Sequence, residues 1–179
     1  FGRLLGISTG STPKAIFYYS ALLPWLYFTG SLSSAGGSLV SGQTLVTKVY
    51  FPRLVLPISY LFTGLLDFAL SFLVLIGMMV WYRHQIQVTW LGCSLVPLFL
   101  LQAMMTALAV SLWLSALMVK YRDVQHLMPF IVQIWMYLCP IVYPMETVRE
   151  KLNEAWLFVY GLNPMVGVIN GFRWALLGT

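Results

Sequence analysis

The chain has 179 residues, of which 60% are hydrophobic and only 8% are charged, and its net charge is +5. Soluble domains carry about 25% charged residues, so this composition excludes a soluble globular domain, and it equally excludes a disordered chain. The basic residues are scattered singly or in pairs, which excludes a nucleic-acid-binding stripe. We therefore predict an all-α, polytopic membrane helix bundle.

Long intervals without charge mark the expected spans. Lys14 and Lys48 enclose 33 uncharged residues, Arg83 and Lys120 enclose 36, and Asp123 and Glu146 enclose 22. The interval between Arg53 and Arg83 holds 29 residues and one acid. A helix crosses the hydrocarbon core with about 20 residues, so each interval is long enough for one span.

Residues 1–14 are rich in Gly, Ser and Thr and predict an exposed loop. The first span is expected over 15–40, with a bulky, aromatic first half and a second half of small residues. Pairs four apart, such as Ser33 and Gly37, allow the backbone of another helix to approach closely. A polar groove that lines a substrate path is the alternative interpretation.

Residues 41–56 connect the first two spans and carry Lys48 and Arg53, with Pro52 inside the segment. Leu, Val and Tyr recur there at helical spacing, which predicts a short amphipathic helix at the membrane surface. Such a helix can also dock a soluble partner. The second span is expected over 58–82 and the third over 91–119.

Asp67 is the only carboxylate inside a predicted span. An acid within the membrane is a functional candidate, but a lone acid lacks the partner that a proton relay or acid–base catalysis needs. A structural role, in a helix contact or a water cavity, is the competing interpretation. No phosphate-binding GxxxxGK motif and no metal-type Cys/His spacing occurs, so we expect no metal site and no ATP hydrolysis by this chain.

The fourth span is expected over 128–143, where Pro140 and Pro144 end or kink the helix. Residues 145–154 are charged and helical in pattern. The apolar stretch 155–172 is broken because Gly161 stops one helix, and Asn163 with Pro164 begins another. Each piece is too short to span, which predicts a re-entrant helical hairpin that gates or lines a pore. A pair of helices lying on the membrane surface is the alternative.

Several separated segments, in this order, resemble the permease subunit of type 2 ABC exporters, in the branch that exports O-antigen, teichoic acid or capsular polysaccharide. The matching strings are ALLPW at 21–25, SLSSAGGSLV at 31–40, KVYFPRLVLPIS at 48–59, KYRDV at 120–124, PFIVQIWMYLCPIVYP at 129–144 and LNPMVGVINGFRWALLG at 162–178. The resemblance implies one permease domain over 1–179 that holds the middle four of six spans. It also implies that the N-terminal helix, the first span and the last span of the family are not in this segment.

The resemblance places 41–56 and 120–127 in the cytoplasm and makes the region around 48–58 the helix that couples to a separate ATP-binding subunit. The coupling candidates are Lys48, Tyr50, Phe51 and Arg53. The hairpin at 145–177 becomes an outer gate, with Gly161, Asn163, Pro164 and Arg173 as its candidate residues. The implied assembly has two permease copies and two ATPases in a bacterial inner (plasma) membrane, and ATP and Mg²⁺ bind the partner subunit.

The implied substrate is a lipid-linked polysaccharide, whose hydroxyls cannot cross hydrocarbon unaided. Aromatic faces let sugars slide without one fixed register. Our channel candidates are therefore aromatic: Tyr19, Trp25, Tyr27, Trp135, Tyr137 and Tyr143. Aromatic belts at the membrane interfaces are the alternative explanation for each. Two other functions stay open: a type 2 ABC exporter of drugs or lipids, and a membrane-embedded lipid–sugar enzyme, which would need clustered acids or histidines.

Overall fold

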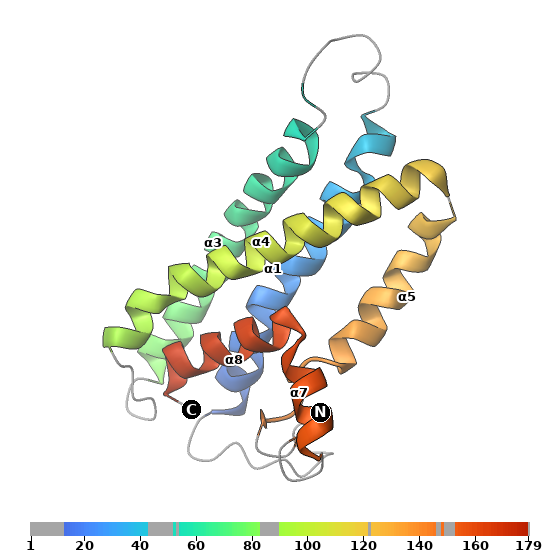
Figure 1. Ribbon diagram of the computed structural model, residues 1–179. Helices are drawn as coiled ribbons and strands as arrows, with labels where there is room; N and C mark the ends of the chain where they lie inside the picture. Colours follow the sequence, from blue (N-terminus) through green and yellow to red (C-terminus); the bar gives the residue numbers. More distant parts are fainter. Residues whose placement is uncertain are drawn as a thin grey trace.

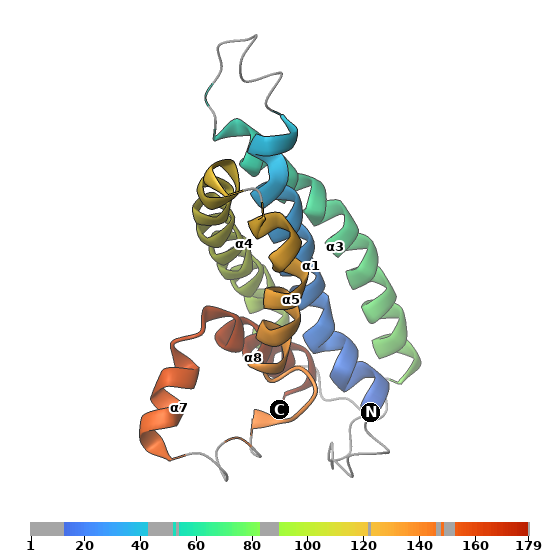
Figure 2. The same cartoon turned by 90° about the vertical axis from the view of Figure 1, so that its right-hand side faces the viewer.

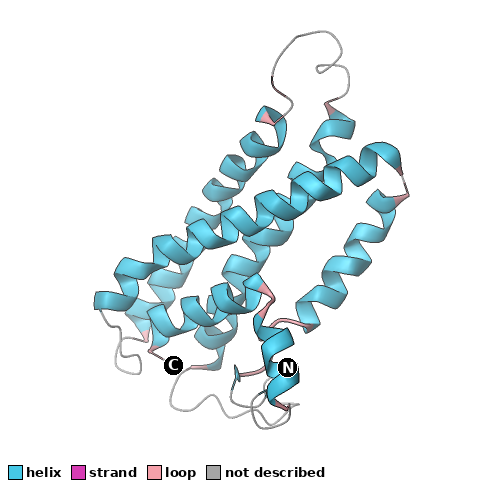
Figure 3. Ribbon diagram, in the orientation of Figure 1, coloured by secondary structure: helices cyan, strands magenta, loops and turns pink. Residues whose placement is uncertain are grey.

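All of the secondary structure in the described part of the chain is helical, as the composition predicts. The computed structural model describes residues 13–42, 52, 54–82, 90–121, 123–145, 148 and 153–178. Figure 3 shows helices and connecting loops throughout these ranges. The helices are α1 (Lys14–Ser41), α3 (Val55–Trp81), α4 (Trp90–Lys120), α5 (Val124–Tyr137), α7 (Glu154–Gly161) and α8 (Pro164–Leu177).

The long helix α1 lies at the centre of the bundle and packs against α3, α4 and α8 (Figure 1). Its buried residues Phe28 and Leu32 join Ala103 and Ala107 of α4 in one hydrophobic core. Helix α5 runs alongside α1, and α8 lies across the end of the bundle at which α1 begins (Figure 2). Helix α7 projects away from that end and buries none of its residues.

Two helices in the described part, α3 and α4, are long and apolar enough to cross a membrane. The pair α7 and α8 meets the same test only when taken together, and its two helices are bent by 88° at the break between them. Length and composition therefore support two spans, or three if the bent pair is one broken span.

The predicted boundaries of the first three spans lie within three residues of α1, α3 and α4. The fourth differs, because α5 ends at Tyr137 and residues 138–141 form turns. Pro140 explains this early end, since its ring clashes with the carbonyl one turn back and disfavours helical geometry at Cys139. The short amphipathic helix expected over 41–56 lies largely outside the described residues.

Helix α1 makes its close contact one position away from where the small-residue pairs predict it. Ser33 is exposed, and a Cβ added at Gly37 would meet nothing within 4 Å. Gly36 is the glycine that faces α4, where an added Cβ would lie 3.1 Å from Leu114. Within the described chain the close approach of α1 is made at Gly36, and the pair Ser33/Gly37 faces none of the described helices, so its role in helix packing stays a prediction.

Candidate functional site

The break between α7 and α8 is formed by Gly161, Asn163 and Pro164, the residues from which it was predicted. Helix α7 ends at Gly161, and Pro164 occupies the first position of α8. The Asn163 side chain caps α8, since its Oδ1 accepts a hydrogen bond from the Met165 backbone N–H at 3.1 Å. The cap satisfies one of the amides that a helix start leaves without a partner. Whether this hairpin gates an exit stays a prediction.

Asn163 also connects the hairpin to α5. The Trp135 indole Nε1 donates to Asn163 Oδ1 at 3.4 Å, and Asn163 Nδ2 donates to the Cys139 thiol sulfur at 3.4 Å. Trp135 in turn packs edge-on against Phe28 of α1, with 5.2 Å between the ring centroids. One amide side chain therefore holds together α5, the turn that follows it and the start of α8.

Arg173 of α8 is a buried cation, with 3% of its surface exposed. Its guanidinium donates to the backbone carbonyls of Ile141 at 2.7 Å and Tyr143 at 3.3 Å. A further contact is a cation–π one, with Arg173 Cζ 3.8 Å from the centroid of the Phe17 ring of α1. Both carbonyls lie in the turns that follow α5, outside any helix, and Arg173 supplies hydrogen-bond donors to them.

Tyrosine hydroxyls complete this group. The Tyr143 hydroxyl lies 3.0 Å from the Tyr137 carbonyl and 3.2 Å from the Tyr160 hydroxyl of α7. We call the set that joins α5, the turn and the hairpin the hairpin cluster: Trp135, Cys139, Tyr143, Tyr160, Asn163 and Arg173. Tyr137 contributes its backbone carbonyl to the cluster, and 56% of its side chain is exposed.

Two of the three aromatic candidates on α1 bond to α3, and the third packs on a ring of its own helix. The Tyr19 hydroxyl donates to the Ser71 carbonyl of α3 at 3.2 Å, and the Tyr27 hydroxyl donates to the Leu61 carbonyl at 3.3 Å. Trp25 is 3% exposed and packs on Phe28. The structure thus gathers Trp135, Tyr137 and Tyr143 near the hairpin but not these three, whose channel role stays a prediction.

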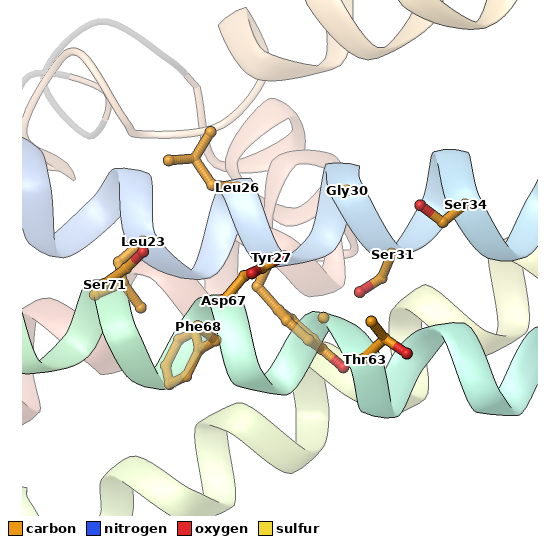
Figure 4. Close-up of a pocket in the computed structure, with 11 residues that line it drawn as sticks. Leu23, Leu26, Tyr27, Gly30, Ser31, Ser34, Thr63, Asp67, Phe68 and Ser71 are labelled. Atoms are coloured by element: carbon orange, nitrogen blue, oxygen red, sulfur yellow. The ribbon is translucent and has the colours of Figure 1, made fainter.

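A second polar region lies between the long helices α1 and α3. A cavity of about 160 Å³ opens there, and its polar lining comes from both helices (Figure 4). The lining includes Tyr27, Ser31 and Ser34 of α1 and Thr63, Asp67 and Ser71 of α3. We call this cavity the α1–α3 groove.

Asp67 and Tyr27 were both singled out from the sequence, and a polar groove was the alternative offered for the small-residue half of α1, whereas Thr63 and Ser71 of α3 were missed. The missed signal is a four-residue spacing: Thr63, Asp67 and Ser71 fall on one face of an otherwise apolar helix. Ser31 carries no comparable signal, because which serine faces α3 depends on the rotation of α1.

The candidates for coupling to an ATPase, Lys48, Tyr50, Phe51 and Arg53, lie outside the described residues. Within the described ranges, no three His, Cys, Asp or Glu side chains gather in a way that could hold a metal ion.

Comparison with known proteins gives the family. A family model for the ABC-2 type transporter matches residues 1–177. The O-antigen export system permease protein RfbA of Myxococcus xanthus is 31% identical over 157 residues, which are 88% of this chain and 58% of the relative. A protein of the same name from Klebsiella pneumoniae is 25% identical over 158 residues, which are 88% of this chain and 59% of that relative.

The chain spans just under three fifths of the length of these curated relatives. The family model, in contrast, covers nearly the whole chain, including the bundle, the α1–α3 groove and the hairpin cluster. The chain belongs to the ABC-2 type transporter family.

Proposed function

We propose that this chain is the core of a permease subunit that exports lipid-linked polysaccharide, of the O-antigen, capsule or teichoic acid type, across the bacterial inner membrane. A separate ATP-binding subunit hydrolyses the ATP, and two permease copies enclose the path. Membership of the ABC-2 type transporter family supports the transporter class. The similarity to two O-antigen export permeases supports the substrate class.

The observation that carries this proposal is the braced break between α7 and α8. Broken backbone at membrane depth is tolerated only against protein or beside a water-filled cavity. Asn163 and Arg173 supply such protein contacts, through hydrogen bonds to the turn after α5. We propose that α7 and α8 form a re-entrant hairpin on the outer side, which narrows the exit of the path.

The four-span arrangement is part of the same proposal. At 1.5 Å per residue, the 28 residues of α1 extend about 42 Å, which is enough to cross a bilayer core of about 30 Å. The serines and glycines of its second half lower its hydropathy without shortening it. The 14 residues of α5 extend only about 21 Å, so we propose that the turns up to residue 143 complete this fourth crossing.

The mechanism follows from what the side chains offer. A lipid-linked sugar chain needs a wetted path, because its hydroxyls lose hydrogen bonds in hydrocarbon. Tyr137, whose carbonyl bonds to the hairpin cluster, has an exposed ring on which the apolar face of a sugar can stack without a fixed register. The hairpin cluster holds the backbone that carries this ring in place while the helices move. ATP binding by the partner subunit shifts the permease between two arrangements through the coupling segment.

A second candidate is an ABC-2 exporter of drugs or lipids. The observation that favours it is the exposed apolar face of α5, on which Phe130 is 70% exposed and Ile134 is 63% exposed. An apolar lining at the path would suit an apolar substrate better than a sugar. The enzyme alternative would need acids or histidines clustered at one interface, and no observation among the described residues favours it.

The surface-glycan profile of a deletion strain tests the substrate class. We expect loss of long surface polysaccharide, restored by the wild-type gene. Trp135→Ala combined with Tyr137→Ala should restore only short chains, whereas Trp135→Phe with Tyr137→Phe, which keeps the aromatic rings, should restore long ones. A normal glycan profile in the deletion strain, with greater sensitivity to apolar toxins, would instead support the drug or lipid exporter.

The coupling prediction is tested on the assembled transporter. Arg53→Glu should lower the ATP hydrolysis that substrate stimulates, because the reversed charge opposes docking of the ATP-binding subunit. Lys48→Gln is the milder companion variant. Unchanged stimulation in the Arg53 variant would remove this residue from the coupling role.

A further inference from the structure

The two helices of the hairpin are attached to the bundle to very different degrees. Helix α8 buries nine of its 14 residues, whereas α7 buries none. Figure 2 shows α8 lying across the end of the bundle and α7 projecting away from it. Within the described chain, α8 is the only helix that α7 contacts more than marginally. The hairpin therefore consists of a firmly packed helix and a loosely attached one.

Close contacts fix α8 against α4. At Gly92, an added Cβ would collide with the Ala175 backbone carbonyl, and at Gly171 it would collide with the Phe99 ring. The Phe172 ring adds a contact with a ring of α3, at 6.0 Å between the centroids. Helices that approach so closely cannot separate without losing packing along the whole contact. Movement of α8 would therefore disturb α3 and α4 together.

Helix α7, in contrast, is held by one side-chain hydrogen bond. Among the described residues, only the Tyr160 hydroxyl links a side chain of α7 to the rest of the structure in this way, at 3.2 Å from the Tyr143 hydroxyl. The Tyr143 hydroxyl donates its single proton to the Tyr137 carbonyl at 3.0 Å. Tyr160 is therefore the donor in the bond between the two hydroxyls, and Tyr143 is the acceptor.

Tyr143 belongs to the firmly packed part of the structure. Its backbone carbonyl accepts a hydrogen bond from Arg173 of α8 at 3.3 Å, and its hydroxyl bonds to Tyr137 at the end of α5. The Tyr160 hydroxyl thus bonds to a side chain whose position is set by α5 and α8. Breaking this one bond releases α7 and leaves the other contacts of Tyr143 intact.

The chain can turn between the two helices without disturbing α8. Gly161 and Leu162 are both exposed and lie before Asn163, whose side chain caps α8. Hinges are formed by a few residues at the ends of elements, which absorb the change in backbone dihedral angles. The Asn163 cap keeps the first turn of α8 in place, so a rotation at residues 161 and 162 moves α7 alone.

We propose that α7 is the moving part of the exit, which swings about Gly161 and Leu162 while α8 stays fixed, and that Tyr160 is the positioning residue that holds it closed. The hydrogen bond from Tyr160 to Tyr143 forms in the closed state and is lost in the open one. Opening separates no buried side chain of α7, and one neutral hydrogen bond changes an equilibrium by only about fivefold. The inference rests on the proposed function in one respect, that the hairpin stands at the exit.

The native residue Cys139 reports the position of α7. Its thiol is fully buried and lies close enough to Tyr160 to interact with it electrostatically. Opening of α7 should expose this thiol to a charged methanethiosulfonate reagent, applied to the assembled transporter in membrane fragments that are accessible from both faces. The variant Ala175→Cys, at a buried position of α8, reports whether α8 moves. Mass spectrometry of the labelled peptides separates both sites from the exposed Cys93.

Tyr160→Phe tests the positioning role, because it removes the hydroxyl and keeps the ring. We expect the labelling rate of Cys139 to rise about fivefold, while the rate at Ala175→Cys stays unchanged. Tyr82→Phe is the matched control and should change neither rate, since its half-exposed side chain forms no hydrogen bond within the described chain. Equal acceleration at both positions would mean that the whole hairpin moves, and this result would overturn the proposal. An unchanged Cys139 rate in Tyr160→Phe would overturn it as well.

The hydrogen bond itself is tested by combining two variants. Tyr143→Phe removes the acceptor for Tyr160 and should also accelerate labelling of Cys139. Because both changes break the same bond, adding Tyr160→Phe to Tyr143→Phe should give no further increase. Effects that multiply would show that the two hydroxyls act independently and would refute the pairing. The labelling needs no exported substrate, so this proposal can fail while the surface-glycan test of the proposed function succeeds, and the reverse.

Discussion

The hairpin cluster and the α1–α3 groove each place one charged side chain in a chain with few charges, but they treat it differently. Arg173 is buried and donates to two carbonyls of its own chain, at Ile141 and Tyr143. Asp67 is exposed and has no partner in the described part of the chain. Arg173 stabilises a helix break within the fold, whereas the Asp67 carboxylate is exposed in the α1–α3 groove. Rarity of charge alone therefore does not distinguish an internal brace from an exposed acid.

We expect the largest loss of stability from removing the Arg173 guanidinium, which stabilises the turn after α5. Arg173→Leu leaves the Ile141 and Tyr143 carbonyls without donors and removes the contact with the Phe17 ring. Hydrogen bonds from a charged group contribute about 1.5 to 3 kcal/mol each, so we expect the free energy of unfolding in detergent to fall by about 3 kcal/mol. Arg173→Lys should retain part of this, because it keeps the charge but loses the fork of donors. Equal stability of Arg173→Leu and wild type would show that the hairpin is held by apolar packing alone.

The second largest loss of stability is expected where α4 and α8 approach closely, at Gly92 and Ala175. A Cβ added at Gly92 would collide with the Ala175 backbone carbonyl, whereas one added at Gly77 of α3 would meet nothing within 4 Å. Gly92→Ala should therefore cost about 2 kcal/mol of unfolding free energy, since backbone cannot yield as a side chain does. Gly77→Ala should be neutral or slightly stabilising. Thermal unfolding of both variants in detergent checks this, and a neutral Gly92→Ala would mean that α8 is free to shift.

The third prediction compares the buried and the exposed face of α3. The helix buries Leu61, Phe68 and Leu75 at a seven-residue spacing and exposes most of its other side chains. Leu75→Ala should lower the free energy of unfolding by roughly 1.5 kcal/mol, mainly through lost packing, because lipid is as apolar as the core. Leu73→Ala, at a position 63% exposed, should change it by less than about 0.5 kcal/mol. Similar losses in both variants would mean that another helix already covers the exposed face of α3 in detergent.

The smallest effect concerns the cap of α8. Asn163→Ala removes the acceptor for the Met165 amide and should cost about 1 kcal/mol. Asn163→Asp keeps that acceptor but not the donor to Cys139, and should retain most of the stability. Hydrogen exchange of the first turn of α8 is the appropriate measurement. If both variants exchange equally fast, the contacts with α5 matter more than the cap.

Much of the fold was predictable because charges and helix-breaking residues act locally. Lys14, Lys120 and the charges near 48–53 and 83 bound the apolar intervals, so the ends of α1, α3 and α4 follow from them. Asn163 and Pro164 specify the start of α8 through their own backbone chemistry. The predictions that fell on 43–51 and 53 concern residues outside the described ranges.

The sites were less predictable because their geometry depends on how helices are rotated about their axes. A rotation of one position placed Gly36 rather than Gly37 against α4, and it turned Ser31 toward α3. Arg173 was recognised as part of the hairpin, but its bonds to Ile141 and Tyr143 depend on a turn that exists only once α5 has ended. No spacing in the sequence encodes such a contact.

The Arg173–Phe17 contact also has a consequence for the order of assembly. Phe17 lies in the first turns of α1, and Arg173 lies near the end of α8, so almost all of the described chain separates them. A ribosome delivers α1, α3 and α4 before it delivers α8, and contacts so distant in sequence can close only at the end. The early helices therefore insert before this contact exists. The contact that fixes α8 against α1 can form only after residue 173 has been synthesised.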